Sequence, residues 1–311
     1  MTRQISATLD SAAPNDPLPL PVRQHSWWVW ITPALSIAIL AIVAWHFRTF
    51  DFQQLIAVVP KSPLFWSVFV IYYMTGIVFD FIIFRWLWGI PLEGMVALAR
   101  KNVSNQLLVD YLGEAYFYSW ARKKVKMTTS PFGAVKDVAI LSAFVSNIVT
   151  LVMMAMVYPF ARTFNLGLTS TALAASVGVI TLISLIVALF SKHIFSLSKG
   201  QLWGISALHA VRLIVSNVLM AVLWSIALPQ VALGWWLVLA TAKMLLGRLP
   251  LISNKDVIFA AFAVLVVGND KEIQILMALM ATLMLLTHLL VGAALAIGDL
   301  VTLPPKRGKA A

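Results

Sequence analysis

The sequence predicts an all-α fold, a polytopic membrane helical bundle of about eight spans. Composition is the first reason: 61% of the 311 residues are hydrophobic, 11% are charged, and the mean hydropathy is +0.90. Soluble domains carry about 45–50% apolar and about 25% charged residues. So few charges leave too little polar surface to cover a soluble body of this size, which means that lipid must be the main solvent.

The second reason is the recurrence of apolar segments, each close to the ~20 residues that cross a bilayer. The first segment, Trp27–Phe47, follows a long polar tail and lacks a small-residue cleavage site, so we expect a retained helix and not a signal peptide. The later predicted spans are Leu64–Phe84, Asp137–Tyr158, Leu168–Phe190, Ile205–Leu228, Ala232–Leu249, Leu251–Val267 and Ile273–Ile297. Leu251–Val267 is short, so re-entry is an alternative for it.

These segments predict one transmembrane domain over residues 27–300, flanked by two tails. Residues 1–26 are polar and rich in proline, which is typical of a disordered cytoplasmic tail. Residues 301–311 carry Lys306, Arg307 and Lys309 and form a basic cytoplasmic tail.

The net charge of +11 is unevenly placed, and its placement predicts the orientation. Residues 85–136 hold eight cations, whereas the predicted external loops hold only Arg48, Lys61, Arg162 and Lys271. Because cytoplasmic loops carry the excess of Lys and Arg, we expect both termini in the cytoplasm and the chain in a bacterial inner (plasma) membrane. The cations between apolar segments indicate membrane lipids, and not nucleic acid, as partners.

Residues 102–122 are too polar to face lipid and too aromatic for a solvated loop. Asp110, Glu114, Tyr118 and Arg122 recur every four residues, which predicts one helical stripe. One interpretation is a polar lining that contacts a lipid headgroup or carries a proton. The other is an amphipathic helix at the cytoplasmic interface.

Charged residues inside or beside the predicted spans are further candidates for substrate binding, because such charges are costly in lipid. Asp80 lies four residues before the end of an apolar run and precedes Arg85; Arg212 lies within the fifth span, and Arg248 near the end of the sixth. Arginine can bind a phosphate with two hydrogen bonds. The alternatives are pairing with a neighbouring charge for Asp80 and snorkelling to the interface for the cations.

The segment around Pro250 interrupts the bundle abruptly. Pro250 ends one helix, and Ser253 and Asp256 have the spacing of an N-capping pair for the next, with Lys255 between them. A helix N-terminus can receive an anionic group, and broken helices are where transporters bind substrates. A plain structural cap is the alternative interpretation.

Motifs for catalysis and metal binding are missing from the sequence. It contains no cysteine, no HExxH, no GxSxG, no nucleotide-binding glycine loop and only five scattered histidines. We therefore predict no cofactor, no metal site and no enzymatic activity.

Two regions resemble the transmembrane region of the lysylphosphatidylglycerol synthase/flippase family and its stand-alone relatives. They are the Gly247–Leu251 break with Asp256 and the long last span, and Arg85-Trp86-Leu87-Trp88 before the polar segment Leu107–Arg122. The chain departs from the family where a glycine-rich stretch ending in glutamate usually follows the proline. The resemblance implies a helical bundle that moves a phospholipid or lipid-linked substrate between leaflets, without lipid aminoacylation.

The sequence-level hypothesis is thus an integral membrane lipid transporter of the flippase type. Its candidate substrate-binding residues are Asp80, Arg85, Asp110, Glu114, Tyr118, Arg122, Arg212, Arg248, Lys255 and Asp256. Two alternatives stay open: a non-catalytic subunit of a membrane complex, with a homo-oligomer or a membrane protein as partner, and an enzyme that acts on a lipid at the cytoplasmic face.

Overall fold

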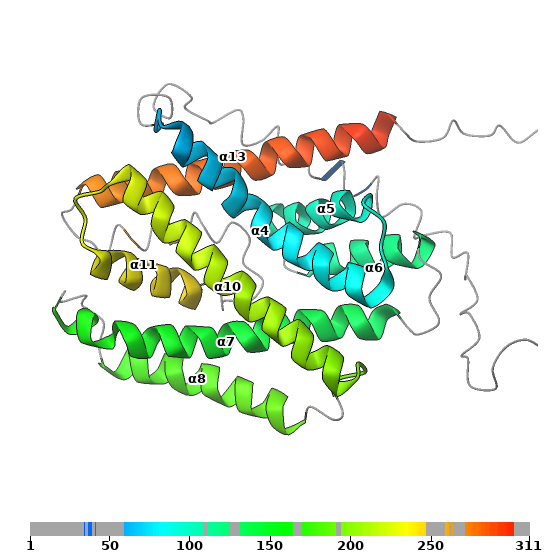
Figure 1. The fold of residues 1–311 in the computed structure, drawn as a ribbon, viewed down its shortest axis with the longest axis horizontal. Coiled ribbons are helices and arrows are strands. Elements are labelled where there is room, and N and C mark those ends of the chain that lie inside the picture. Colours follow the sequence, from blue (N-terminus) through cyan, green and yellow to red (C-terminus); the bar gives the residue numbers. More distant parts are fainter. Residues whose placement is uncertain are drawn as a thin grey trace, which may run out of the picture.

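The computed structural model describes residues 34, 37, 38, 41, 59–108, 111–124, 131–163, 170–190, 194–246, 259, 260, 263 and 271–301. These residues form helices and connecting turns, with no strand among them. The helices are α4 (Pro63–Trp88), α5 (Gly94–Leu107), α6 (Leu112–Lys124), α7 (Pro131–Thr163), α8 (Ser170–Leu189), α10 (Lys199–Ala227), α11 (Leu233–Leu246) and α13 (Lys271–Val301). Figure 1 shows long helices crossing the molecule, with the short pair α5 and α6 beside α4. The all-helical prediction is confirmed.

Four helices of the described part are long and apolar enough to cross a membrane, which confirms the prediction of a membrane bundle in its coarse form. They span Pro63–Trp88, Gly133–Met156, Lys199–Ala227 and Lys271–Asp299. Shorter apolar helices cover Val177–Leu189 and Gly234–Leu246, where the sequence predicts two further spans. The predicted spans Trp27–Phe47 and Leu251–Val267 lie almost wholly outside the described residues, so the count of eight stays a prediction.

Local sequence signals set the ends of α4 and α10. α4 begins at a proline, whose fixed φ and missing N–H suit the first helical position. It ends at Gly89, which adopts φ 63° and donates its N–H to the carbonyl oxygen of Arg85 at 2.8 Å. α10 begins with a capping box, in which Ser198 and Gln201 satisfy each other's backbone N–H groups.

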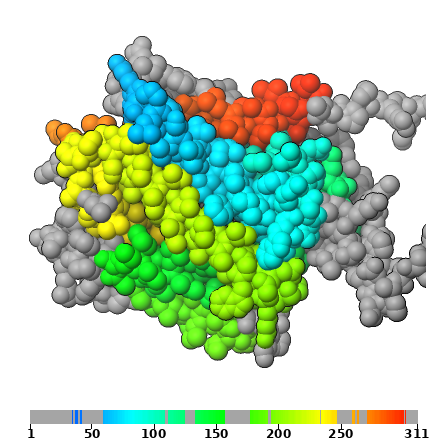
Figure 2. All heavy atoms as spheres, in the orientation of Figure 1, coloured from blue at the N-terminus to red at the C-terminus, as the bar shows by residue number. Residues whose placement is uncertain are grey.

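α4 and α10 pack antiparallel along one face of the molecule (Figures 1 and 2). The Tyr72 hydroxyl contacts Met220 Sδ at 3.8 Å near one end, and the Trp86 ring lies against Gly204 near the other. A β-carbon at Gly204 would come within 2.6 Å of that ring, so glycine permits the close approach. The pair joins two apolar cores, one around Phe65 and Trp224 and one around Phe84 and Leu98.

α5 and α6 form a helical hairpin whose closed end points into the bundle. The exposed ends of the hairpin are joined by Lys124 Nζ and Glu93 Oε2 at 3.0 Å. Deeper along α6, the Phe117 ring packs 4.6 Å from the ring of Phe84. Glu114, three residues before Phe117, lies at the same depth as Asp80, because Lys101 forms ion pairs with both carboxylates. The hairpin thus enters beside the last turns of α4 and turns back near Asp80.

This hairpin divides residues 102–122 between two helices. α5 ends at Leu107, Tyr111 takes the left-handed φ of 69°, and α6 begins at Leu112. Gly113 permits the tight return: a β-carbon there would collide with the backbone carbonyl oxygen of Lys101. Glu114, Tyr118 and Arg122 follow one another along α6 at the predicted spacing of four residues, and Asp110 lies outside the described residues.

Candidate functional site

Asp80 lies at the centre of a network of charges between the hairpin and the spanning helices. Lys101 Nζ, from α5, donates to Asp80 Oδ2 at 2.6 Å. Arg212 Nη1, from α10, donates to Asp80 Oδ1 at 3.1 Å. Each oxygen of this buried carboxylate therefore faces its own cation, which compensates a charge that would otherwise be costly in the bundle.

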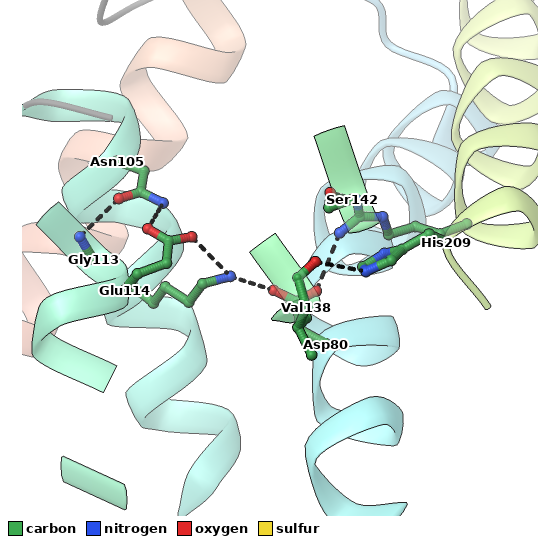
Figure 3. A network of polar contacts seen from close by, with 9 residues as sticks. Asp80, Asn105, Gly113, Glu114, Val138, Ser142 and His209 are labelled. Carbon is green, nitrogen blue, oxygen red and sulfur yellow. Dashed lines mark hydrogen bonds and ion pairs between the residues drawn. The ribbon is translucent and has the colours of Figure 1, made fainter. Parts of the chain in front are cut away.

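The hairpin contributes a second carboxylate to the network, as Figure 3 shows. Glu114 Oε1 lies 3.4 Å from Lys101 Nζ, so one ammonium group serves two carboxylates. Asn105 fixes this geometry, because its Nδ2 donates to Glu114 Oε2 at 2.9 Å and its Oδ1 accepts from the Gly113 N–H at 2.7 Å. One amide side chain thereby ties the end of α5 to the start of α6.

α7 closes the network on the side away from the hairpin. Arg212 Nη2 donates to Ser142 Oγ at 2.8 Å. His209, one helical turn before Arg212, is fully buried, and its Nε2 lies 3.2 Å from the carbonyl oxygen of Val138. Because a carbonyl oxygen only accepts, Nε2 carries the ring proton in this arrangement. Ser142 and Val138 thus hold the α10 side of the site against α7.

A cavity of about 310 Å³ adjoins these groups. Phe84, Val135, Ala139 and Leu213 supply apolar surface from three helices. Tyr111, at the closed end of the hairpin, is 57% exposed and also borders the cavity. The polar lining consists of Asp80, Lys101, Glu114, Ser142, Ser146, His209 and Arg212.

The charges of the network balance. Two carboxylates, Asp80 and Glu114, face two cations, Lys101 and Arg212. Burial alone would lower the pKa of Lys101, but the nearby charges of Asp80 and Glu114 outweigh burial and hold the pKa above its ordinary value. Lys101 therefore stays an ammonium ion between the two carboxylate side chains.

A second buried ion pair anchors the hairpin to α13. Arg100 is 1% exposed, forms an ion pair with Asp299, and donates to the carbonyl oxygen of Leu295 at 2.5 Å. Its guanidinium also lies 5.5 Å from the centre of the Tyr116 ring. Lys101 and Arg100 thus point to different sides of α5, one into the cavity and one to the last helix.

The structure brings together three of the predicted site residues: Asp80, Glu114 and Arg212. Arg85 does not join them, since it is exposed at the end of α4 and donates to the carbonyl oxygen of Ile90 at 3.1 Å. Tyr118 and Arg122 lie farther along α6 and do not border the cavity. Asp110, Arg248, Lys255 and Asp256 lie outside the described residues.

Sequence reasoning missed five members of the site: Lys101, Asn105, Ser142, Ser146 and His209. In the sequence, Lys101 is one of the eight cations of residues 85–136, which are interpreted only as the positive charge of a cytoplasmic loop. Its spacing to Asn105, four residues, is the signal that places both side chains on one face of α5. Ser142 carries no such signal, because a serine in an apolar helix most often bonds to its own backbone.

Metal binding has no candidate in the part of the chain that the structure describes, where no group of three or more His, Asp or Glu side chains could hold an ion. Comparison with models of protein families, with curated proteins and with solved structures finds no match for this chain.

Proposed function

We propose that this chain is an integral membrane transport protein that moves an amphipathic lipid between leaflets. The observation that carries the proposal is the charge network around Asp80, which lies inside a helical membrane bundle and borders a cavity of about 310 Å³. Ionisable groups within membrane helices are rare and costly, and they commonly mark substrate or ion paths. A polar cavity between apolar helices suits a molecule with a polar head and apolar chains.

The hairpin of α5 and α6 supports transport in preference to a purely structural role for these charges. Helices of 14 and 13 residues are too short to cross a bilayer. Short helices and interrupted backbone at membrane depth are tolerated where they line a cavity, and transporters bind their substrates at such elements. Lys101, Asn105 and Glu114 sit on this hairpin, so a short element that packs against the spanning helices supplies three members of the network.

The resemblance to the lysylphosphatidylglycerol synthase/flippase membrane region remains part of this proposal. The region that carries its first half, from Arg85 to Arg122, is the region that contains the hairpin. The charge distribution supports an orientation with this end of the bundle in the cytoplasm of a bacterial cell. Arg85, Lys123, Lys124, Lys136 and Lys199 all belong to helix ends on the same side of the bundle as the open end of the hairpin.

The test is lipid movement in proteoliposomes that contain the purified chain alone. Fluorescently labelled anionic, zwitterionic and glycosylated lipids are incorporated, and a membrane-impermeant quencher reports which leaflet they occupy. We expect quenching to pass beyond the outer-leaflet half only when protein is present. Lys101→Met, which removes the cation shared by two carboxylates, should slow this movement at least tenfold, whereas Lys61→Met, at an exposed position outside the network, should leave it unchanged.

A result in which every labelled lipid stays in its leaflet, with protein that is folded and correctly inserted, would refute lipid movement by this chain. Equal rates for wild type and Lys101→Met would instead show that lipid moves by a path that does not use the network.

A further inference from the structure

The cavity beside Asp80 offers many polar groups without a surplus of charge. Every charged side chain that borders it already faces an opposite charge: Asp80 faces Lys101 and Arg212, and Glu114 faces Lys101. Because the two carboxylates and the two cations cancel, the described lining attracts neither an anionic nor a cationic headgroup by net charge.

A charged headgroup would have to compete with contacts inside the network. A phosphate could take the remaining N–H groups of Lys101 or Arg212, but it would bring a further negative charge close to Asp80, whose oxygens lie 2.6 Å and 3.1 Å from those two cations. Because the network is already neutral, no cation of the lining compensates that added charge, and an uncompensated charge is among the larger penalties in protein interiors. A zwitterionic headgroup meets the same obstacle twice, once for each of its charges.

Hydroxyl groups meet no such obstacle. A carboxylate oxygen has two lone pairs, so Asp80 and Glu114 can accept hydroxyl protons while their ion pairs persist. Ser142 accepts from Arg212 at 2.8 Å, and its own proton is a donor for a neighbouring oxygen. The network therefore offers both donors and acceptors to a neutral group with several hydroxyls.

Size and apolar lining agree with this chemistry. A volume of about 310 Å³ is at the small end of ligand cavities, so it suits one headgroup and not an acyl chain. Phe84 and Leu213 give the cavity apolar sides, which suit the C–H surface of a sugar ring.

We infer that this cavity binds the uncharged, hydroxyl-rich headgroup of a glycosylated lipid. The inference rests on the proposed function for its physiological meaning, because it names the class of lipid that would be moved. The binding step itself needs only the geometry of the cavity, and can therefore be tested separately from transport.

The experiment measures lipid binding to the full chain by native mass spectrometry, with four lipids of identical acyl chains. They are monoglucosyl-diacylglycerol, phosphatidylglycerol, phosphatidylethanolamine and diacylglycerol, which lacks the sugar. We expect monoglucosyl-diacylglycerol to bind at least tenfold more tightly than each of the other three. The transport measurement in proteoliposomes is then repeated with the same four headgroups.

Two variants locate the binding site. Ala139→Leu fills the cavity from α7 and should abolish the preference for the sugar, whereas Ala155→Leu adds the same side chain at an exposed position of α7 and should leave it intact. Ser142→Ala removes one hydroxyl and leaves the ion pairs in place, so it should weaken sugar binding about fivefold, which corresponds to one hydrogen bond.

The outcomes separate the inference from the proposed function. Equal or tighter binding of phosphatidylglycerol or phosphatidylethanolamine would overturn the inference, and so would sugar binding that survives in Ala139→Leu. Selective sugar binding without movement of any lipid would overturn the transport proposal and leave the binding site standing. Movement of lipids with no preference for the sugar would overturn the sugar-binding inference and leave the transport proposal standing.

Discussion

Removing Lys101 tests whether the network is held together by charge balance. In Lys101→Met, Asp80 keeps Arg212 at 3.1 Å, but Glu114 keeps only its hydrogen bond from Asn105 at 2.9 Å. Glu114 is 18% exposed at its side chain, so water screens the remaining charge poorly. An uncompensated buried charge costs about 3–5 kcal/mol, and we expect the free energy of unfolding to fall by about that amount.

The double variant Lys101→Met with Glu114→Gln should be more stable than Lys101→Met alone. It removes one positive and one negative charge together, which leaves the neutral pair of Asp80 and Arg212. We expect the double variant to regain about 2 kcal/mol, because no unpaired carboxylate remains. Glu114→Gln alone should cost only about 1–2 kcal/mol, since Lys101 retains its 2.6 Å contact with Asp80.

The assay is reversible unfolding in mixed micelles by added anionic detergent, followed by tryptophan fluorescence. The 12 tryptophans give a strong signal. The coupling energy between positions 101 and 114 is the change in the free energy of unfolding of the double variant minus the sum of the changes in the two single variants. If the change in the double variant equals the sum of the two single changes, the two side chains act independently, and charge balance does not hold the network together.

Three further predictions concern the hairpin and its anchors. Gly113→Ala should destabilise the fold by more than about 2 kcal/mol, because its β-carbon meets the backbone of Lys101, whereas Gly178→Ala, with nothing within 4 Å, should be neutral or slightly stabilising by thermal unfolding. Asp299→Asn should cost more stability than Arg100→Met in the same assay, because it leaves a guanidinium that is 1% exposed without its ion-pair partner, while Arg100→Met leaves a carboxylate that is 30% exposed and can be hydrated. The raised pKa of Lys101 predicts that its contribution to stability is complete below its ordinary value of 10.5 and is lost as pH rises through the folded-state pKa; the difference in stability between wild type and Lys101→Met should therefore stay constant up to about pH 10 and shrink at higher pH. A difference that is unchanged or larger at the higher pH would contradict this assignment.

The sequence predicts the spanning helices well because their signal is local. The predicted spans Leu64–Phe84 and Ile273–Ile297 lie within α4 and α13, since a long apolar run has few alternatives to a helix in lipid. The hairpin is less visible from sequence. Its turn depends on Gly113 fitting against Lys101, a contact between two helices that no spacing rule along one helix contains.

The candidate site divides in the same way. Asp80 and Arg212 could be proposed from sequence because a charge in an apolar run is conspicuous by itself. That they face each other across 132 positions follows only from the packing of α4 on α10. Lys101 could not be proposed in this way, because it is one of many cations in residues 85–136 and nothing in the composition of that segment shows that it is buried.

The partition of charge between the hairpin and the spanning helices has a consequence for motion. Lys101 and Glu114 belong to the hairpin and sum to zero, and Asp80 and Arg212 belong to α4 and α10 and also sum to zero. Moving the hairpin away from α4 therefore breaks the contact between Lys101 and Asp80 and leaves each side with its own ion pair. Because neither side of this network is left with an unpaired charge, a movement that pivots on α13 and keeps the ion pair of Arg100 with Asp299 costs less than deleting Lys101 or one of its carboxylates. The same partition that makes Lys101→Met costly thus makes movement of the intact hairpin comparatively cheap, and a transporter that opens and closes a polar cavity within lipid needs an element with that property.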